Sequence, residues 1–214
     1  MKALRLVCSQ LACRRGARLL FEGLDLSLSP GAALVVTGPN GTGKSSLLRI
    51  LAGLARPEAG SVRLEGAAES EHYGTETHYL GHLDSHKGAL TARENLAFWC
   101  DMLAVRAAGA GDIEDALAAV GLDGLGSLPA AVLSAGQKRR LALARLLVAP
   151  RPLWLLDEPT TALDTSAQAT FAALARAHVE EGGLLIVATH APLDIGPFAS
   201  LDLATYRPAR PVAA

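Results

Sequence analysis

Residues 38–46 of this chain read Gly38-Pro39-Asn40-Gly41-Thr42-Gly43-Lys44-Ser45-Ser46, and they fit the pattern G-x-x-x-x-G-K-[ST]. The preceding residues 33–37 are apolar and rich in β-branched side chains, which predicts a buried parallel strand. The following leucines and isoleucine, spaced for a helix from 47 to 54, stop at Gly53 and Pro57. A strand, a glycine loop and a helix N-terminus in this order direct backbone N–H groups at phosphates. The stretch therefore predicts a phosphate-binding loop in an α/β core sheet of the P-loop type.

The chemistry of this pattern predicts two roles at once. Lys44 would reach the β- and γ-phosphates of a nucleotide, and the hydroxyl of Ser45 would hold Mg²⁺. A second apolar run, residues 153–156, delivers Asp157 and Glu158 at its end, where open α/β sheets bind ligands. Asp157 is expected to hold Mg²⁺ through water, and Glu158 to polarise the attacking water as a general base. ATP and Mg²⁺ are the cofactors that these residues predict.

A second anion site is expected at the start of another helix. Ser134, Gly136 and Gln137 begin a leucine- and alanine-rich helix over about 135–149, and a hydroxyl and glycine N–H groups at a helix N-terminus bind anions. One phosphate-binding loop has no use for a second such site within one chain. The pattern therefore predicts a dimer in which each chain closes over the γ-phosphate held by the other.

His190 follows the apolar run 184–188 and completes the set of expected catalytic groups. A lone histidine is more often structural, but one at the end of a central strand can reach the γ-phosphate. We therefore expect His190 to act as a switch residue beside Lys44 and Glu158.

Composition excludes several classes of protein. The 214 residues carry a net charge of −1, so no electrostatic argument favours nucleic acid as a partner. No run approaches the roughly 18–20 apolar residues that span a bilayer, and the N-terminus has no signal-peptide pattern. A cytoplasmic protein is expected. Cys8, Cys13 and Cys100 are too few for a disulfide framework and are expected to be buried thiols.

The remaining pattern predicts one domain over residues 1–214. Alternation within residues 2–37 and at 62–64 predicts an antiparallel sheet beside the nucleotide-binding core. A helical insert is expected at about 84–132, with a helix over 91–106 that Thr91 and Glu94 cap, a break at 107–111, and a helix from Asp112 to residue 121. A short strand at 78–80 and a helix over 165–181 capped by Asp164 complete the core. Residues 66–77 are expected to be irregular, and the tail from residue 191 carries little signal.

Together these motifs resemble the nucleotide-binding subunit of an ABC transporter over nearly the whole chain. Further segments are similar to one subfamily, the haem exporter ATP-binding subunit of bacterial cytochrome c maturation: residues 21–24, the run 38–54, Gly81-His82, residues 90–96 and residues 133–140. The resemblance implies an ABC ATPase fold and ATP hydrolysis coupled to transport. It also implies a peripheral position on the cytoplasmic face of the bacterial inner membrane, integral membrane subunits as partners, and haem handled by the complex rather than bound by this chain.

Two positions depart from the general ABC pattern. His82 stands where the family places a glutamine that watches Mg²⁺, and a neutral imidazole can still make one hydrogen bond there. Arg15 stands near the place of the aromatic residue that stacks on adenine, and a guanidinium plane can stack on a base too.

The partner surface and the remaining histidines leave alternatives open. We expect the loop 81–90 and the following helical insert to receive the membrane subunit, although an ordinary solvated loop is the alternative. His78, His82 and His86 are four residues apart, but Gly81 argues against a helix that would align them as haem or metal ligands. The rival functions are an ATPase subunit for another transported substrate, and a non-transport ABC ATPase that acts on nucleic acid or ribosomes.

Overall fold

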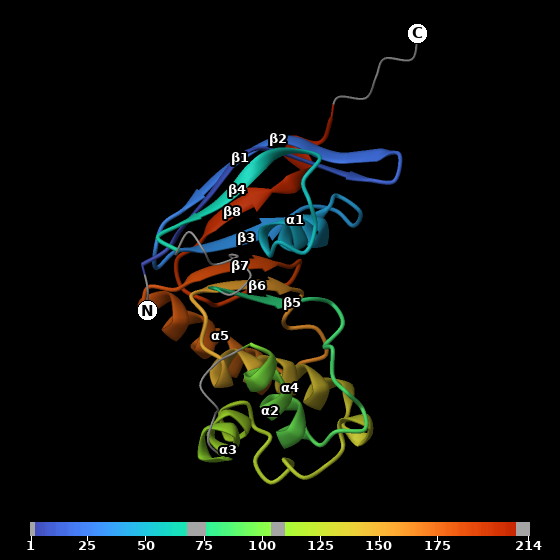
Figure 1. Cartoon of the computed structure of the whole chain (residues 1–214), viewed down its shortest axis with the longest axis vertical. Helices are drawn as coiled ribbons and strands as arrows, with labels where there is room; N and C mark the ends of the chain where they lie inside the picture. Colours follow the sequence, from blue (N-terminus) through green and yellow to red (C-terminus); the bar gives the residue numbers. More distant parts are fainter. Residues whose placement is uncertain (1–2, 68–75, 104–109, 209–214) are drawn as a thin grey trace.

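The core of the molecule is a five-stranded parallel sheet. The computed structural model describes residues 3–67, 76–103 and 110–208. The strand order is β5-β6-β7-β3-β8 (Figure 1), and every neighbouring pair is parallel. The strands are β3 (Ala33–Thr37), β5 (Thr77–Leu80), β6 (Leu153–Asp157), β7 (Leu184–Ala188) and β8 (Ala199–Asp202). The predicted strands of the core are confirmed, including the short one at 78–80.

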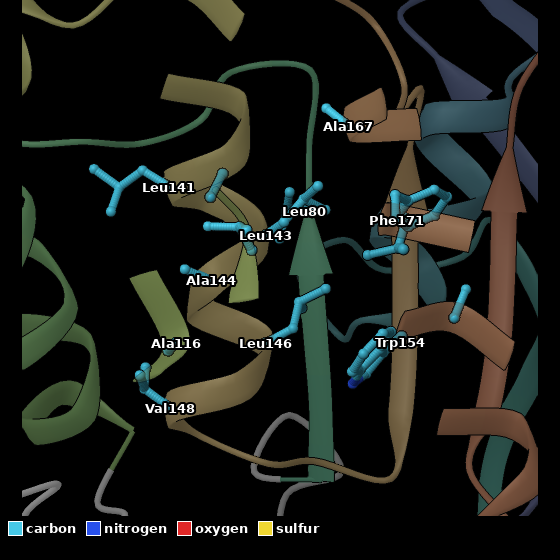
Figure 2. Packing of buried hydrophobic residues seen from close by; sticks show 14 of the residues in the cluster. Leu80, Ala116, Leu141, Leu143, Ala144, Leu146, Val148, Trp154, Ala167 and Phe171 are labelled. Atoms are coloured by element: carbon cyan, nitrogen blue, oxygen red, sulfur yellow. The ribbon is translucent and has the colours of Figure 1, made fainter. Parts of the chain in front are cut away.

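The core sheet divides the hydrophobic interior into two clusters, one on each face. Successive residues of a strand point to opposite faces, and the three central strands follow this rule strictly. On β6, Trp154 and Leu156 join the cluster packed by the helices α2, α3, α4 and α5, whereas Leu153 and Leu155 join the cluster packed by α1 and the antiparallel sheet. Figure 2 shows part of the first cluster, to which Leu146 of α4, Trp154 of β6 and Phe171 of α5 belong. Burial on both faces explains why these strands are apolar without alternation.

A three-stranded antiparallel sheet covers one side of the core (Figure 1), as predicted. Its order is β2-β1-β4, with β1 (Arg5–Arg15), β2 (Arg18–Leu28) and β4 (Ala59–Glu65). The hairpin β1–β2 is longer than the alternation indicated, because a register shift after Cys8 interrupts the pattern. Gln10 has a φ of 49° at this shift. Gly60 faces the backbone oxygens of Ser9 and Gln10, where a Cβ would not fit.

The helical insert lies within the predicted range. It consists of α2 (Ala92–Met102), α3 (Ala110–Ala119) and the 3₁₀ turn η2 (Ala130–Val132). Thr91 and Glu94 form the predicted capping box. The expected role of Asp112 as an N-cap is wrong, because α3 begins at Ala110 and Asp112 lies in its first turn. Residues 107–109 of the expected break, and residues 68–75 of the expected irregular segment, lie outside the described residues.

Two further helices pack against the core sheet as predicted, whereas α1 is shorter than predicted. The helices α4 (Ala135–Val148) and α5 (Thr165–Glu180) match their predicted ranges, and Asp164 caps α5 by accepting a hydrogen bond from the Ala167 N–H at 2.8 Å. The helix α1 (Lys44–Leu51) ends before Leu54, which is 63% exposed. The chain turns at Gly53, whose φ is 71°, and this turn carries Leu54 off the buried face.

The segment after residue 191 contains an unpredicted strand. β8 pairs with β3 from Leu34 to Thr37 and is followed by the 3₁₀ turn η3 (Leu203–Tyr206). Its residues are mostly exposed, so neither apolar content nor alternation marks it. β8 forms at the edge of the sheet because it pairs with β3, which is distant in sequence. Its own residues do not show the apolar pattern of a strand.

The three cysteines are buried thiols, as expected. Burial raises the pKa of the Cys8 thiol to about 12 and also raises the pKa of Cys13. Among the described residues, no helix has the length and apolar character that crossing a bilayer requires.

Candidate functional site

The glycine loop connects the end of β3 to the start of α1. Gly43 occupies the N-cap position of α1 with a φ of 108°, and a Cβ there would lie 3.2–3.3 Å from Leu20 and Phe21. The Thr42 hydroxyl donates to the Pro39 carbonyl at 2.9 Å, and the buried Lys44 ammonium donates to the Gly38 carbonyl at 2.7 Å. These hydrogen bonds therefore fix the conformation of the loop, and the start of α1 faces the neighbouring cleft.

That cleft has a volume of about 360 Å³ and brings together most of the predicted site. Its walls come from the hairpin β1–β2, the glycine loop, the loop after β5 and the end of β6. The lining residues are Arg15, Arg18, Leu20, Asn40, Gly41, Gly43, Lys44, Ser45, Ser46, His82, Asp157 and Glu158. Segments up to 143 residues apart in sequence thus contribute to one cleft.

The two carboxylates leave the end of β6 in different environments. Asp157 is buried at the strand end, while Glu158 follows with a φ of 47°, a value that is uncommon for a residue with a Cβ. The Glu158 N–H donates to the Ala188 carbonyl at 2.8 Å, and its carboxylate accepts from the Thr189 hydroxyl at 2.9 Å. Thr189, which sequence analysis missed, is itself oriented by the Ala191 N–H at 3.0 Å. The end of β7 therefore fixes the direction of the Glu158 side chain.

His190 contacts the glycine loop directly. Its Nε2 lies 2.8 Å from Lys44 Nζ and 3.2 Å from Asn40 Oδ1. A lysine ammonium carries only donors, so in a hydrogen bond between these two groups Nε2 is the acceptor. The structure thus brings together Lys44 and His190, as the sequence predicted.

Ser134, Gly136 and Gln137 do not line this cleft. They form the N-terminus of α4, where Ser134 and Gln137 make a capping box: the Ser134 hydroxyl accepts from the Gln137 N–H at 3.2 Å, and the Gln137 side chain accepts from the Ser134 N–H at 2.8 Å. A Cβ at Gly136 would lie 2.8 Å from the Ala162 carbonyl oxygen, so this position accommodates only glycine. Within one chain, the two predicted anion sites are therefore separate.

Sequence analysis also missed Arg139, a buried residue of α4. It stands in the basic run Lys138-Arg139-Arg140, in which nothing in the sequence distinguishes the buried cation from its two half-buried neighbours. Its hydrogen bonds reach the backbone at Asp157 and Glu158.

The three spaced histidines have three different surroundings. His78 is buried on β5 beside the Ala149 carbonyl, and burial lowers its pKa to about 3. His82 is exposed and lines the cleft, and His86 Nε2 lies 2.8 Å from the Lys138 carbonyl. In the described parts of the chain, no three His, Cys, Asp or Glu side chains gather as metal ligands.

The donor set at the cleft fits Mg²⁺. Ser45 and Asp157 line the same cleft and offer hydroxyl and carboxylate oxygens, the hard ligands that this ion binds together with water and phosphate. His82 offers a ring nitrogen to the cleft, which suits a hydrogen bond to water better than direct ligation.

A second groove of about 600 Å³ adjoins the nucleotide cleft and shares Ser45, His82 and Asp157 with it. Its other walls come from α1, β5, the loop 81–85, α2 and α4, including Arg49, Tyr79, Trp99 and Arg145. The Arg145 guanidinium lies 4.3 Å from the centroid of the Trp99 ring. Leu54 and Leu83 at this groove are 63% and 80% exposed, so the surface presents apolar side chains to solvent.

Comparison with known proteins gives a consistent result. Residues 21–161 match the family model described as ABC transporter. The chain is 53% identical over 192 residues to the cytochrome c biogenesis ATP-binding export protein CcmA of Nitrobacter winogradskyi, covering 90% of this chain and 94% of that protein. It is 50% identical over 202 residues to the CcmA protein of Rhizobium meliloti, covering 94% and 98%. A solved ATP-binding subunit of an ABC transporter superposes with a TM-score of 0.79 at 22% identity, covering 86% of this chain and 79% of that one.

Proposed function

Because the chain belongs to the ABC transporter family and, within it, to the cytochrome c biogenesis ATP-binding export proteins, we propose that it is the ATP-hydrolysing subunit of a membrane export complex that serves cytochrome c biogenesis. The observation that carries the proposal is the convergence of Lys44, Ser45, Asp157 and Glu158 on one cleft. We also propose that residues 1–214 act as one nucleotide-binding domain.

In the proposed reaction, water attacks the γ-phosphorus in line, and the bond from phosphorus to the β–γ bridging oxygen breaks, which releases ADP and inorganic phosphate. Glu158 accepts the proton of the attacking water, and the hydrogen bond from Thr189 aims its carboxylate. Lys44 neutralises charge on the β- and γ-phosphates, and the N–H groups at the start of α1 face the same anion. His190, next to Lys44, holds the γ-phosphate in place.

Mg²⁺ would be held by Ser45 and, through water, by Asp157. When bound, it supplies positive charge that screens the phosphates. His82 would make a hydrogen bond to water in this part of the cleft, in place of the glutamine of related ATPases.

The second anion site supports a proposal of dimerisation. The N-terminus of α4 carries Ser134, Gly136 and Gln137, and it lies outside the cleft of its own chain. In a dimer, these groups would bind the γ-phosphate that the partner copy holds, so ATP would lie at the interface.

The groove beside the cleft supports a proposal for the membrane partner. Apolar Leu54 and Leu83, together with the aromatic Trp99, give the groove the character of a docking surface rather than a solvated loop. We place the integral membrane subunit on the loop 81–90 and the helical insert, and the chain on the cytoplasmic face of the inner membrane. We also propose that haem is handled by the complex rather than bound by this chain.

Two variants test the ATPase assignment. Lys44→Ala should abolish ATP turnover, because the phosphates lose their fixed cation. Glu158→Gln should keep ATP binding and stop hydrolysis, so that an ATP-bound dimer accumulates and is seen by size-exclusion chromatography. Wild-type hydrolysis in Lys44→Ala would refute the assignment, and a Glu158→Gln variant that stays monomeric with ATP at high concentration would count against the dimer.

A further inference from the structure

The guanidinium of Arg139 has an acceptor for every one of its five N–H groups, although the residue is 4% exposed. Its Nε donates to the Pro159 carbonyl at 3.0 Å. Its Nη2 donates to the carbonyls of Asp157 and Glu158, both at 2.8 Å. This one side chain therefore binds the backbone at the end of β6 and in the following turn, from which the carboxylates of Asp157 and Glu158 project.

The other nitrogen of Arg139 reaches the proposed docking loop. Nη1 donates to the Gly81 carbonyl at 3.1 Å and to the carboxylate of Asp84 at 2.6 Å. The Asp84 side chain is 22% exposed, so this ion pair is only partly screened by solvent. Arg139 thus joins the loop to the end of β6, two elements that have no other side-chain hydrogen bond between them among the described residues.

The two ends of this connection are themselves well anchored. On the loop side, His86 bonds the Lys138 carbonyl, and the buried amide of Asn95 donates to the Lys87 and Leu90 carbonyls while its oxygen accepts from the Lys87 N–H. On the catalytic side, Glu158 has a φ of 47°, and its N–H donates to the Ala188 carbonyl. Both ends of the connection through Arg139 are therefore held by further hydrogen bonds of their own.

We propose that Arg139 is a positioning residue for ATP hydrolysis, which sets the backbone of Glu158 according to the position of the loop 81–90 through its ion pair with Asp84. The inference rests on the proposed function, because it takes Glu158 as the base and the loop as the docking surface. Arg139 also lies in α4, two residues after Gln137. Its side chain therefore connects the loop 81–90 and the end of β6 to the helix whose N-terminus would contact the partner copy's ATP.

The test compares steady-state hydrolysis of MgATP by the purified full-length chain and its variants. Arg139→Gln should lower kcat by about tenfold or more with KM within about twofold, because it misplaces the base without touching the nucleotide. Asp84→Asn, which leaves the three carbonyl bonds on β6 and the following turn, should lower kcat by roughly two- to fivefold. Arg139→Lys should not restore kcat, since one ammonium cannot span five acceptors.

The double variant Arg139→Gln/Asp84→Asn should be no slower than Arg139→Gln alone, because both changes break one connection. Arg176→Gln is the matched control: it removes the same charge from an ion pair with Asp194 at 3.2 Å, where the Asp194 side chain is 91% exposed, and it should leave kcat unchanged. Thermal unfolding shows whether each variant is folded. If Arg139→Gln does not fold, the kcat of Asp84→Asn tests the inference.

The outcomes separate the two levels of the argument. If Glu158→Gln hydrolyses ATP as fast as the wild type, the proposed function fails and the inference fails with it. If Glu158→Gln is inactive while Arg139→Gln and Asp84→Asn both keep kcat within about twofold of the wild type, only the inference is overturned. A loss confined to KM, or losses that multiply in the double variant, would also overturn it.

Discussion

Single side chains at the cleft are held by hydrogen bonds that leave them few orientations. Lys44 is bound to Gly38 and contacts His190, and Glu158 is aimed by Thr189. Arg15 is different, because it is the exposed last residue of β1 and pairs across the hairpin with Arg18. Both arginines line the same cleft as the glycine loop, and they reach it from the hairpin β1–β2.

Arg15 is therefore expected to stack on adenine. Base stacking contributes about 1–3 kcal/mol, so Arg15→Ala should weaken ATP affinity by roughly one to two orders of magnitude in isothermal titration calorimetry. Arg14→Ala is the control, since Arg14 pairs with Glu58 at 3.1 Å instead of lining the cleft. Equal ATP affinity of Arg15→Ala and the wild type would contradict the stacking.

At the scale of elements, the sequence predicts what local pattern and local chemistry determine. The glycine loop, the strand that carries Asp157 and Glu158, and the capped helices all follow from residues close together in sequence. β8 and the full length of the β1–β2 hairpin could not be predicted, because both depend on pairing between strands rather than on alternation. Thr189 and Arg139 were missed for the same reason: their partners, at Glu158 and Asp84, lie 31 and 55 residues away.

The contact between α5 and β6 makes stability depend on pH. His178 of α5 stacks on Trp154 with ring centroids 3.9 Å apart, and its Nε2 bonds the Leu184 carbonyl at 3.1 Å. Burial lowers the pKa of His178 to about 4. Above its unfolded pKa of about 6.5 the residue is neutral in both states, whereas between about 6.5 and 4 only the unfolded chain binds the proton. The free energy of unfolding should therefore fall as the pH falls through this window.

For His178 alone, this loss is at most about 1.4 kcal/mol per pH unit. His178→Gln keeps an N–H donor near Leu184 but does not titrate, so its free energy of unfolding in urea should differ less between pH 7.5 and pH 5.0 than that of the wild type. The buried His78 contributes in the same direction and remains in the variant. His82→Gln, at an exposed position, is the control, and a pH dependence of His178→Gln as steep as the wild type's would exclude this explanation.

At the scale of the whole molecule, the core sheet separates two packed layers (Figure 1). The cleft lies at the carboxyl ends of β3 and β6. The loop 81–90 leaves β5 at that same edge and leads to the helical insert. The proposed docking groove and the cleft share Ser45, His82 and Asp157, so a partner in the groove would contact residues of the cleft.

This arrangement predicts that loop variants uncouple the subunits. Ser85 is exposed at the groove, and the Lys87 ammonium lies 4.3 Å from the centroid of the Phe98 ring. Ser85→Trp and Lys87→Glu should keep ATP binding by the isolated chain but lower both co-purification with the membrane partner and cytochrome c maturation in cells. Ser61→Trp, on the exposed strand β4, should lower neither. Normal association and maturation in both loop variants would show that this loop is not the coupling surface.

The burial of Cys8, Cys13 and Cys100 has a practical consequence for labelling the loop 81–90 with a reporter group. Labelling reagents attack the thiolate form of cysteine. The raised pKa values of Cys8 and Cys13 keep these thiols protonated at neutral pH, and Cys100 is only 2% exposed, so reagents reach it poorly. A cysteine introduced as Ser85→Cys should then be the one fast-reacting thiol in the folded chain, which a colorimetric thiol assay before and after denaturation would verify. A fluorophore could be attached at the tip of the loop without first removing any native cysteine.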